Sequence, residues 1–352
     1  MSLDLVKVAA QVWGMVTRLK ADGERRQKQL SHALNILHQQ SANLDALRKK
    51  IAASKTTWLV AGLVEGFDRR FQALPLPADF TVMATDGSHI DVDRHRSARC
   101  YLINIGSVVL RYGTDPDAIL DSSPCLYAGD EDLVIAPAGD SRGREQPVEG
   151  ALLGIKRGIN ELQRLAEMTA ELPAGSSALA LLDGTLILWG LEAYPDFVSE
   201  ALLGNGLLKY LGEIRNSGKD KRLSLASYIS FPRSADVVNA LRVALCPRDP
   251  LDTDRYCQYC ESRECDVIAG MQDREIFSNL LEPGERSALF VSQSSVVKKH
   301  YGEHGVYFLY LRLENEIARL EVPQWVAEDE SLLNLTHTLV LDQCRRGQGY
   351  PV

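Results

Sequence analysis

The stretch FTVMATDGS at residues 80–88 has a close parallel in ALALLDGT at residues 178–185. Each is an apolar run that ends in Asp-Gly followed by a hydroxyl residue, so each predicts a buried strand with its aspartate at the strand end. Asp-Gly is also the commonest signal for a tight hairpin turn, and either copy taken singly is weak. Two copies in the same context favour aspartates that face a common cleft.

The segments between these two stretches predict the rest of a sheet. Strands are expected at 99–105 and 107–112, and a loop over much of 114–140. An apolar stripe at helical spacing then predicts a helix over 149–171. The order of three strands, a helix and a further strand is that of an RNase H-like core. We therefore predict an α/β fold with a mixed sheet, flanking helices and an N-terminal helical extension.

Three carboxylates stand where this order would bring them together. Asp86 and Asp183 end two strands that can lie side by side in such a sheet, and Glu161 lies on the intervening helix. Carboxylate oxygens are the ligands that Mg²⁺ and Mn²⁺ prefer, and two such ions can promote hydrolysis of a phosphodiester. The sequence therefore predicts a metal-dependent phosphodiester hydrolase. Glu149 is the alternative helix ligand, but it falls near the helix start and farther from Asp183.

The composition of the 352-residue chain, with 45% hydrophobic and 24% charged residues, is typical of a globular protein. It contains no apolar run long enough for a membrane span and no secretion signal, so we expect a cytoplasmic protein. The net charge of −8 argues against a general nucleic-acid binder but does not exclude DNA, because a carboxylate site is itself acidic. The sequence has no Gly-x4-Gly-Lys-Ser/Thr loop, so any motor activity has to come from a partner.

The N-terminal region has helical periodicity over residues 3–52, with a leucine seam from Leu30 to Leu47. The seam could bury itself against a partner helix or pack on its own domain. The segment 74–78, which has prolines at 75 and 77, then predicts a rigid linker. We expect a helical region at 1–73 that serves oligomerisation or partner docking, and a catalytic domain at 79–352.

Four of the seven cysteines form a cysteine-rich insertion near 246–265: Cys246, Cys257, Cys260 and Cys265. Clustered thiols in a cytosolic chain favour a metal over disulfides. A structural Zn²⁺ site and an iron–sulfur cluster use the same ligands, so both stay open. A chance collection of free thiols is the alternative, because only the Cys-x2-Cys pair matches a familiar metal-binding spacing.

Several motifs taken together resemble the NurA family of DNA-repair nucleases, which are RNase H-like in fold. The motifs are Asp86-Gly-Ser88, Arg157-x3-Glu161, Leu182-Asp-Gly-Thr-Leu186, Leu320-Glu-Val-Pro-Gln-Trp325 and Gln343-Cys-x2-Gly-x-Gly-Tyr-Pro351. The resemblance implies a Mn²⁺-dependent nuclease that acts on single-stranded DNA and DNA ends. It also implies a homodimer that docks on the hexameric DNA-pumping ATPase HerA. By position, Asp86, Glu161 and Asp183 would be the metal ligands.

One departure from the family pattern concerns its C-terminal end. The family continues past the Gly-Tyr-Pro segment into a helix with an active-site histidine, whereas this sequence ends at Val352. Either the sequence is truncated or this member lacks that histidine, and no histidine of this sequence matches the position, so none is given the role. The alternative function is a noncatalytic DNA-binding or docking subunit that regulates a motor ATPase. Converging carboxylates favour the nuclease, because their mutual repulsion serves no purpose in a scaffold.

Overall fold

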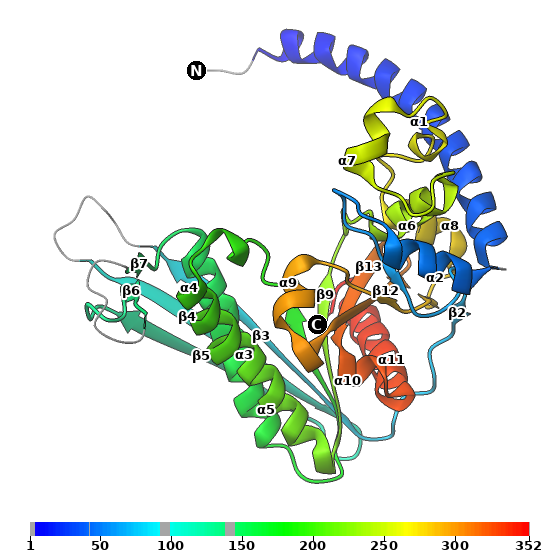
Figure 1. The fold of residues 1–352 in the computed structure, drawn as a ribbon. Coiled ribbons are helices and arrows are strands. Elements are labelled where there is room, and N and C mark those ends of the chain that lie inside the picture. Colours follow the sequence, from blue (N-terminus) through cyan, green and yellow to red (C-terminus); the bar gives the residue numbers. More distant parts are fainter. Residues whose placement is uncertain (1–3, 42, 92–98, 138–144, 352) are drawn as a thin grey trace.

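The fold is seen in a computed structural model that describes residues 4–41, 43–91, 99–137 and 145–351. Within these residues lies an 11-stranded mixed sheet with helices on its faces (Figure 1). Its strands are β1 Gly62–Leu63, β2 Arg70–Phe71, β3 Phe80–Ile90, β4 Tyr101–Tyr112, β5 Asp117–Tyr127, β8 Ser177–Asp183, β9 Arg222–Ile229, β10 Arg286–Ser287, β11 Phe290–Val291, β12 Val306–Arg312 and β13 Ile317–Pro323. Across the sheet they follow the order β1-β11-β12-β13-β9-β8-β3-β4-β5, and β10 pairs with both β12 and β2.

The centre of the sheet has the predicted RNase H-like arrangement. Strands β3, β4 and β5 form an antiparallel meander, and β8 lies parallel to both β3 and β9. The last register pair between β3 and β8 is Thr85 with Leu182, so the residues that follow, Asp86 and Asp183, lie on neighbouring strands. The predicted mixed α/β fold is therefore confirmed.

Two details of the strand prediction are wrong. Strand β4 is continuous, because Gly106 pairs with Asp86 on one side and Ser122 on the other and breaks neither ladder. Strand β5 occupies part of the segment predicted as a loop, and ten of its eleven residues are exposed. Such a strand has no apolar face to reveal it in the sequence. It lies at the sheet edge, where main-chain pairing with β4 holds it and where Pro124 is tolerated.

Helices cover both faces of the central strands. The alternating side chains of β8 divide between the faces, because successive residues of a strand point to opposite sides. Ala180 and Leu182 pack on the side of α3 (Ala151–Ala170) and α5 (Lys209–Ser217), while Leu179 and Leu181 pack on the side of α11 (Glu330–Arg346). Strand β8 is thus buried between two helical layers up to Asp183, which is exposed.

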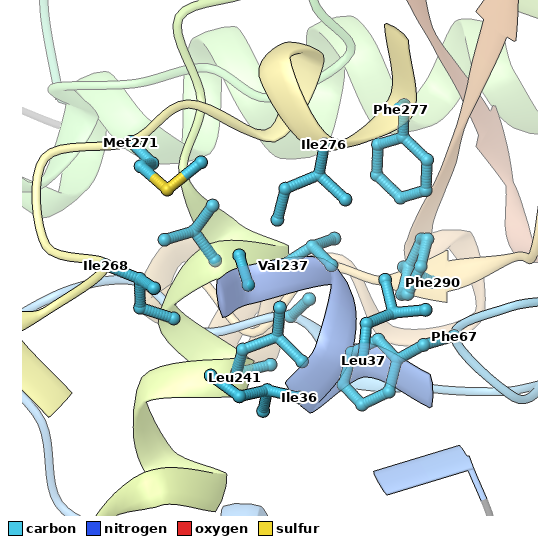
Figure 2. Close-up of a cluster of buried hydrophobic side chains, with 14 of the residues drawn as sticks. Ile36, Leu37, Phe67, Val237, Leu241, Ile268, Met271, Ile276, Phe277 and Phe290 are labelled. Atoms are coloured by element: carbon cyan, nitrogen blue, oxygen red, sulfur yellow. The ribbon is translucent and has the colours of Figure 1, made fainter. Parts of the chain in front are cut away.

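The N-terminal region consists of two helices and two short strands. Helix α1 (Leu5–Ser41) continues through Gly23, and α2 (Leu44–Ala53) follows it. Leu37 and its neighbour Ile36 are buried against α6 (Asp236–Leu245) and α8 (Asp273–Leu280), as Figure 2 shows. The leucine seam therefore packs on its own chain. Because β1 and β2 also join the main sheet, region 1–73 shares its core with residues 79–352, and its role in docking stays a prediction.

The remaining elements are short. They are β6 Val134–Ile135, β7 Gln146–Pro147, α4 Asp196–Ser199, α7 Thr253–Tyr256, α9 Ser295–His300, α10 Gln324–Ala327, the 3-10 helices Leu191–Ala193, Gly218–Asp220, Cys257–Tyr259, Glu264–Asp266 and Gly302–His304, and the π-helix Glu200–Leu208. Among the described helices, none combines the length and the apolar character needed to cross a membrane.

Candidate active site

Asp86 and Asp183 line one pocket at the end of the parallel strands. The pocket has a volume of about 360 Å³, and Tyr228 and Tyr350 also form part of its wall. Both aspartates are exposed, so their carboxylates are accessible from solvent. The structure therefore brings these two predicted site residues together, as the parallel register requires.

The two Asp-Gly dipeptides differ in structure. Strand β8 ends at Asp183, and Gly184 has a φ of +96°, a left-handed conformation that glycine adopts without strain. Strand β3 instead runs past Asp86 to Ile90 and stays paired with β4, which corrects the predicted strand end. The sequence could not separate the two cases, because the pairing that prolongs β3 is made by a different strand.

Glu161 approaches the aspartates from α3, on the other face of β3. Its side chain does not line the pocket and is 6% exposed. Its carboxylate lies over Gly87, where an added Cβ would be 2.5 Å from Glu161 Oε1 and 2.9 Å from Arg157 Cγ. The helix is fixed to the strand at this point because Thr85 Oγ1 donates a hydrogen bond to the Glu161 carbonyl oxygen at 3.1 Å. Gly87 thus provides the space in which Glu161 reaches β3.

Arg157 neutralises Glu161 in this structure. Arg157 Nε lies 3.1 Å from Glu161 Oε1, and its Nη1 donates a hydrogen bond to the Gly87 carbonyl oxygen at 2.9 Å. The pKa of Glu161 is raised to about 7: burial is the largest cause, Arg157 opposes it, and the negative charges of Asp86 and Asp183 add to the rise. The three predicted carboxylates are therefore close enough to influence one another electrostatically.

The chemistry of these residues fits a hard divalent cation. All three side chains offer oxygen ligands, and in this structure Glu161 Oε1 is engaged in its ion pair with Arg157. In the described ranges, no group of three or more His, Cys, Asp or Glu residues is placed to hold a metal ion, so the three carboxylates do not form a closed metal site. The alternative ligand Glu149 precedes the first residue of α3, whereas Glu161 faces β3.

Tyr350 is a site residue to which the sequence assigned no role. Its ring meets that of Tyr228 edge-on, with 5.2 Å between centroids. Burial raises the pKa of its phenol, as do its hydrogen bond with Asp183 and the negative charge of Asp86. The only sequence signal was its place in the Gly-Tyr-Pro segment, which follows α11 and lies far from Asp183 along the chain.

The four clustered cysteines line a different pocket, of about 480 Å³, which lies beside Trp58 and Tyr256. Hydrogen bonds from the main chain of Arg263, and others from Ser262, lower the pKa of Cys260. Burial raises the pKa of Cys257 and Cys265. These thiols share one pocket, but the described residues include no group of three or more that is placed to hold an ion. The structure thus gives no support to a closed zinc or iron–sulfur centre, and a metal bound there stays a prediction.

Several solved structures are remotely similar to this chain. A crystal structure of NurA with manganese is 13% identical, with a TM-score of 0.33, over 91% of this chain and 90% of that chain. Argonaute from Aquifex aeolicus is 13% identical, with a TM-score of 0.27, over 80% of this chain and 26% of that chain. Prototype foamy virus protease–reverse transcriptase is 14% identical, with a TM-score of 0.23, over 43% of this chain and 18% of that chain.

A search among curated proteins finds no match, whereas a protein-family model does match this chain. The family model of the NurA domain matches residues 80–352, which is most of the chain and includes both Asp-Gly strands, α3 and the Gly-Tyr-Pro segment. This chain therefore belongs to the NurA family.

Proposed function

We propose that this chain is a metal-dependent DNA nuclease in which Asp86, Glu161 and Asp183 hold Mn²⁺ or Mg²⁺. Membership of the NurA family supports a nuclease-type role. The observation that carries the proposal is the register of β3 and β8, which sets Asp86 and Asp183 beside each other on one accessible pocket. Exposed carboxylates at adjacent strand positions repel each other unless a cation lies between them.

Each side chain has a separate part in the proposed reaction. Asp86 and Asp183 would bind the cation from the pocket, and Glu161 would join them from α3 once its side chain turned from Arg157 toward the aspartates. Arg157 opposes the desolvation of the Glu161 carboxylate and so favours its charged form, although the pKa of Glu161 is still raised to about 7. Tyr350 orients Asp183 through its hydrogen bond. When bound, a divalent ion supplies an activated water and stabilises charge on the phosphate.

The pocket supports a single-stranded substrate or a DNA end. Its wall combines the two carboxylates with apolar side chains such as Val108 and Leu120. A site of this kind can bind one nucleotide, with the phosphate at the carboxylates and the base or sugar on the apolar wall. The base would have to leave its partner strand first, which a duplex interior resists.

We further propose that the protein acts in DNA-end processing or repair as a homodimer with a HerA-type ATPase, and that it works in the cytoplasm with its DNA substrate. The family resemblance supports this assembly. The first half of α1 also exposes apolar side chains, among them Leu5 (70%), Val6 (80%) and Leu19 (59%). Its apolar face is therefore available for a protein partner.

The test is cleavage of labelled single-stranded and double-stranded DNA with Mn²⁺, Mg²⁺ or EDTA. We expect cleavage that requires metal and that Asp86→Asn and Asp183→Asn each abolish, with circular dichroism unchanged. Asp115→Asn, at an exposed turn residue outside the pocket, is the control and should cleave like the wild type. Cleavage by Asp86→Asn or Asp183→Asn at the wild-type rate would contradict the proposal. DNA binding without cleavage would favour the noncatalytic subunit.

A further inference from the structure

A row of buried charged side chains runs from the turn after Asp183 to the starts of α6 and α8. Its members and their exposed fractions are Glu321 (1%), Arg319 (3%), Asp236 (6%) and Asp273 (0%). A buried charge is tolerated only when it is paired and hydrogen-bonded, so the partners of such a row hold fixed positions.

Glu321 on β13 binds the turn that carries Asp183. Its Oε2 accepts a hydrogen bond from Thr185 Oγ1 at 2.7 Å and another from the Leu186 main-chain N–H at 3.0 Å. Thr185 Oγ1 in turn accepts one from the Ile187 N–H at 3.1 Å. One carboxylate oxygen therefore fixes both the side chain and the main chain just after the Asp-Gly dipeptide.

Arg319 holds Glu321 from the opposite side. Its Nε donates to Glu321 Oε1 at 3.0 Å, and its Nη1 donates to Asp236 Oδ2 at 2.9 Å. The guanidinium carbon also lies 3.7 Å from the centre of the Phe308 ring. With one oxygen bound to Arg319 and the other to the turn, the Glu321 carboxylate has little freedom to rotate.

The sheet holds the same turn at its other end. The Gly184 N–H donates to the Tyr228 carbonyl oxygen at 3.0 Å, next to the last register pair, Asp183 with Tyr228. The segment from Asp183 to Leu186 is thus fixed by β9 on one side and by Glu321 on the other. Asp183 itself is exposed, so its direction depends on this segment and on its hydrogen bond with Tyr350.

We propose that Glu321 is a positioning residue for Asp183, which it holds toward the pocket through the Thr185 hydroxyl. The inference rests on the proposed function, because it assumes that Asp183 binds the metal ion. Residues that orient a metal ligand in this way typically change metal affinity or activity about 10- to 100-fold when they are altered.

The main test is Thr185→Val in the full-length protein, because valine keeps the shape of threonine and removes the hydroxyl. We expect the Kd for Mn²⁺, measured by electron paramagnetic resonance without DNA, to rise about 10-fold. The Mn²⁺ concentration that gives half-maximal cleavage of single-stranded DNA should rise in parallel. Thr185→Ser keeps the hydroxyl and should restore wild-type Mn²⁺ binding.

A second variant approaches the contact from the other side. Glu321→Asp keeps a negative charge beside Arg319 but shortens the side chain, so it should reach Thr185 poorly and weaken Mn²⁺ binding in the same way. Combined with Thr185→Val it should add little, because both changes break the same contact. Thr169→Val is the control for losing a threonine hydroxyl away from Glu321: Thr169 is buried, whereas Thr185 is exposed, and its hydroxyl donates to Ala166 within α3.

The outcomes separate the inference from the proposed function. Wild-type Mn²⁺ binding in Thr185→Val or in Glu321→Asp would overturn the positioning role and leave the nuclease intact. Weak Mn²⁺ binding in Thr185→Ser as well would also overturn it, because the hydroxyl would then not be what matters. A wild-type protein that neither binds Mn²⁺ nor cleaves DNA would instead refute the proposed function.

Discussion

The carboxylate of Glu161 occupies the space that a side chain at Gly87 would need, because an added Cβ would lie only 2.5 Å from Glu161 Oε1. Gly87 does not have a positive φ and lies within a regular strand, so an alanine there is acceptable to the backbone. The glycine therefore serves the approach of α3 to β3 and not a turn.

The first prediction is that Gly87→Ala folds normally but loses activity. The added methyl group should push Glu161 and Arg157 away from β3, and a shift of about 1 Å at such a site lowers the rate about 100-fold. Cleavage of single-stranded DNA at saturating Mn²⁺ measures the effect. Gly154→Ala is the control, because an added Cβ there meets nothing within 4 Å. Equal activity in both variants would contradict the close packing of Glu161.

The second prediction concerns the phenol of Tyr350. Tyr350→Phe keeps the ring against Tyr228 and removes the hydrogen bond to Asp183, so the fold should hold while cleavage falls about 5- to 10-fold. Rates at saturating Mn²⁺ measure the loss. Tyr259→Phe, at a tyrosine that is 79% exposed and distant from the pocket, should have no effect. A Tyr350→Phe enzyme as fast as the wild type would remove Tyr350 from the site.

The third prediction concerns stability and pH. Burial lowers the pKa of His337 from 6.5 to about 4, and its Nε2 lies 2.9 Å from the Gly284 carbonyl oxygen. The unfolded chain binds a proton at His337 between pH 6.5 and 4 and the folded chain does not, so stability is lost as pH falls through this window. The loss is at most about 3 kcal/mol.

His337→Gln tests this, because glutamine can donate to Gly284 but does not titrate. Urea unfolding of the variant between pH 4 and 7 should show a weaker pH dependence than the wild type. His32→Gln, on the exposed face of α1, should keep the wild-type slope. Identical slopes for His337→Gln and the wild type would show that His337 is not buried in its neutral form.

The fourth prediction separates docking from folding in α1. Leu30, Leu37 and Leu47 belong to the core, so deleting residues 1–52 should unfold the protein. Deleting only residues 1–22 removes the exposed apolar half of α1 and should leave the fold intact while it changes the oligomer or abolishes binding to the ATPase. Light scattering and co-purification measure these effects. An unchanged oligomer together with unchanged ATPase binding would exclude a docking role.

The fifth prediction ranks the cysteines by reactivity. Cys260 is half-buried with a lowered pKa, whereas Cys344 is buried and burial raises its pKa to about 12. Iodoacetamide should therefore modify Cys260 well before Cys344. Mass spectrometry with and without a chelator tests the predicted metal as well. If the four clustered cysteines are protected from iodoacetamide and the chelator removes this protection, a metal is bound there. If they are labelled without the chelator and the protein contains neither zinc nor iron, they are free thiols.

The buried elements were predictable because their sequences carry a strong apolar pattern. The helix expected at 149–171 is α3, Ala151–Ala170, and the strand expected at 178–182 is β8, Ser177–Asp183. Strand β5 was not predictable, since its stability comes from pairing with β4 and its side chains face water. Apolar periodicity in a sequence indicates burial, and an exposed edge strand has no such periodicity.

Site residues were predictable only where their position follows from the order of strands and helices along the chain. The proximity of Asp86 to Asp183 follows from two strands in parallel register, whereas the choice of Glu161 as the helix ligand stays a prediction. Tyr350 and Glu321 reach the site from distant segments of the chain, through contacts that no local pattern encodes. The space that Gly87 leaves for Glu161 likewise depends on how α3 packs against β3.

The buried row beneath the turn has a consequence for how this protein can change during evolution. Arg319 is a single cation bound by two carboxylates, Asp236 and Glu321, and removing one member would leave a buried charge unpaired. A substitution at any one of these positions is therefore destabilising unless the other two positions change as well. Among homologous chains, residues 236, 319 and 321 should vary as a set, with charged and uncharged versions of the trio and few mixtures.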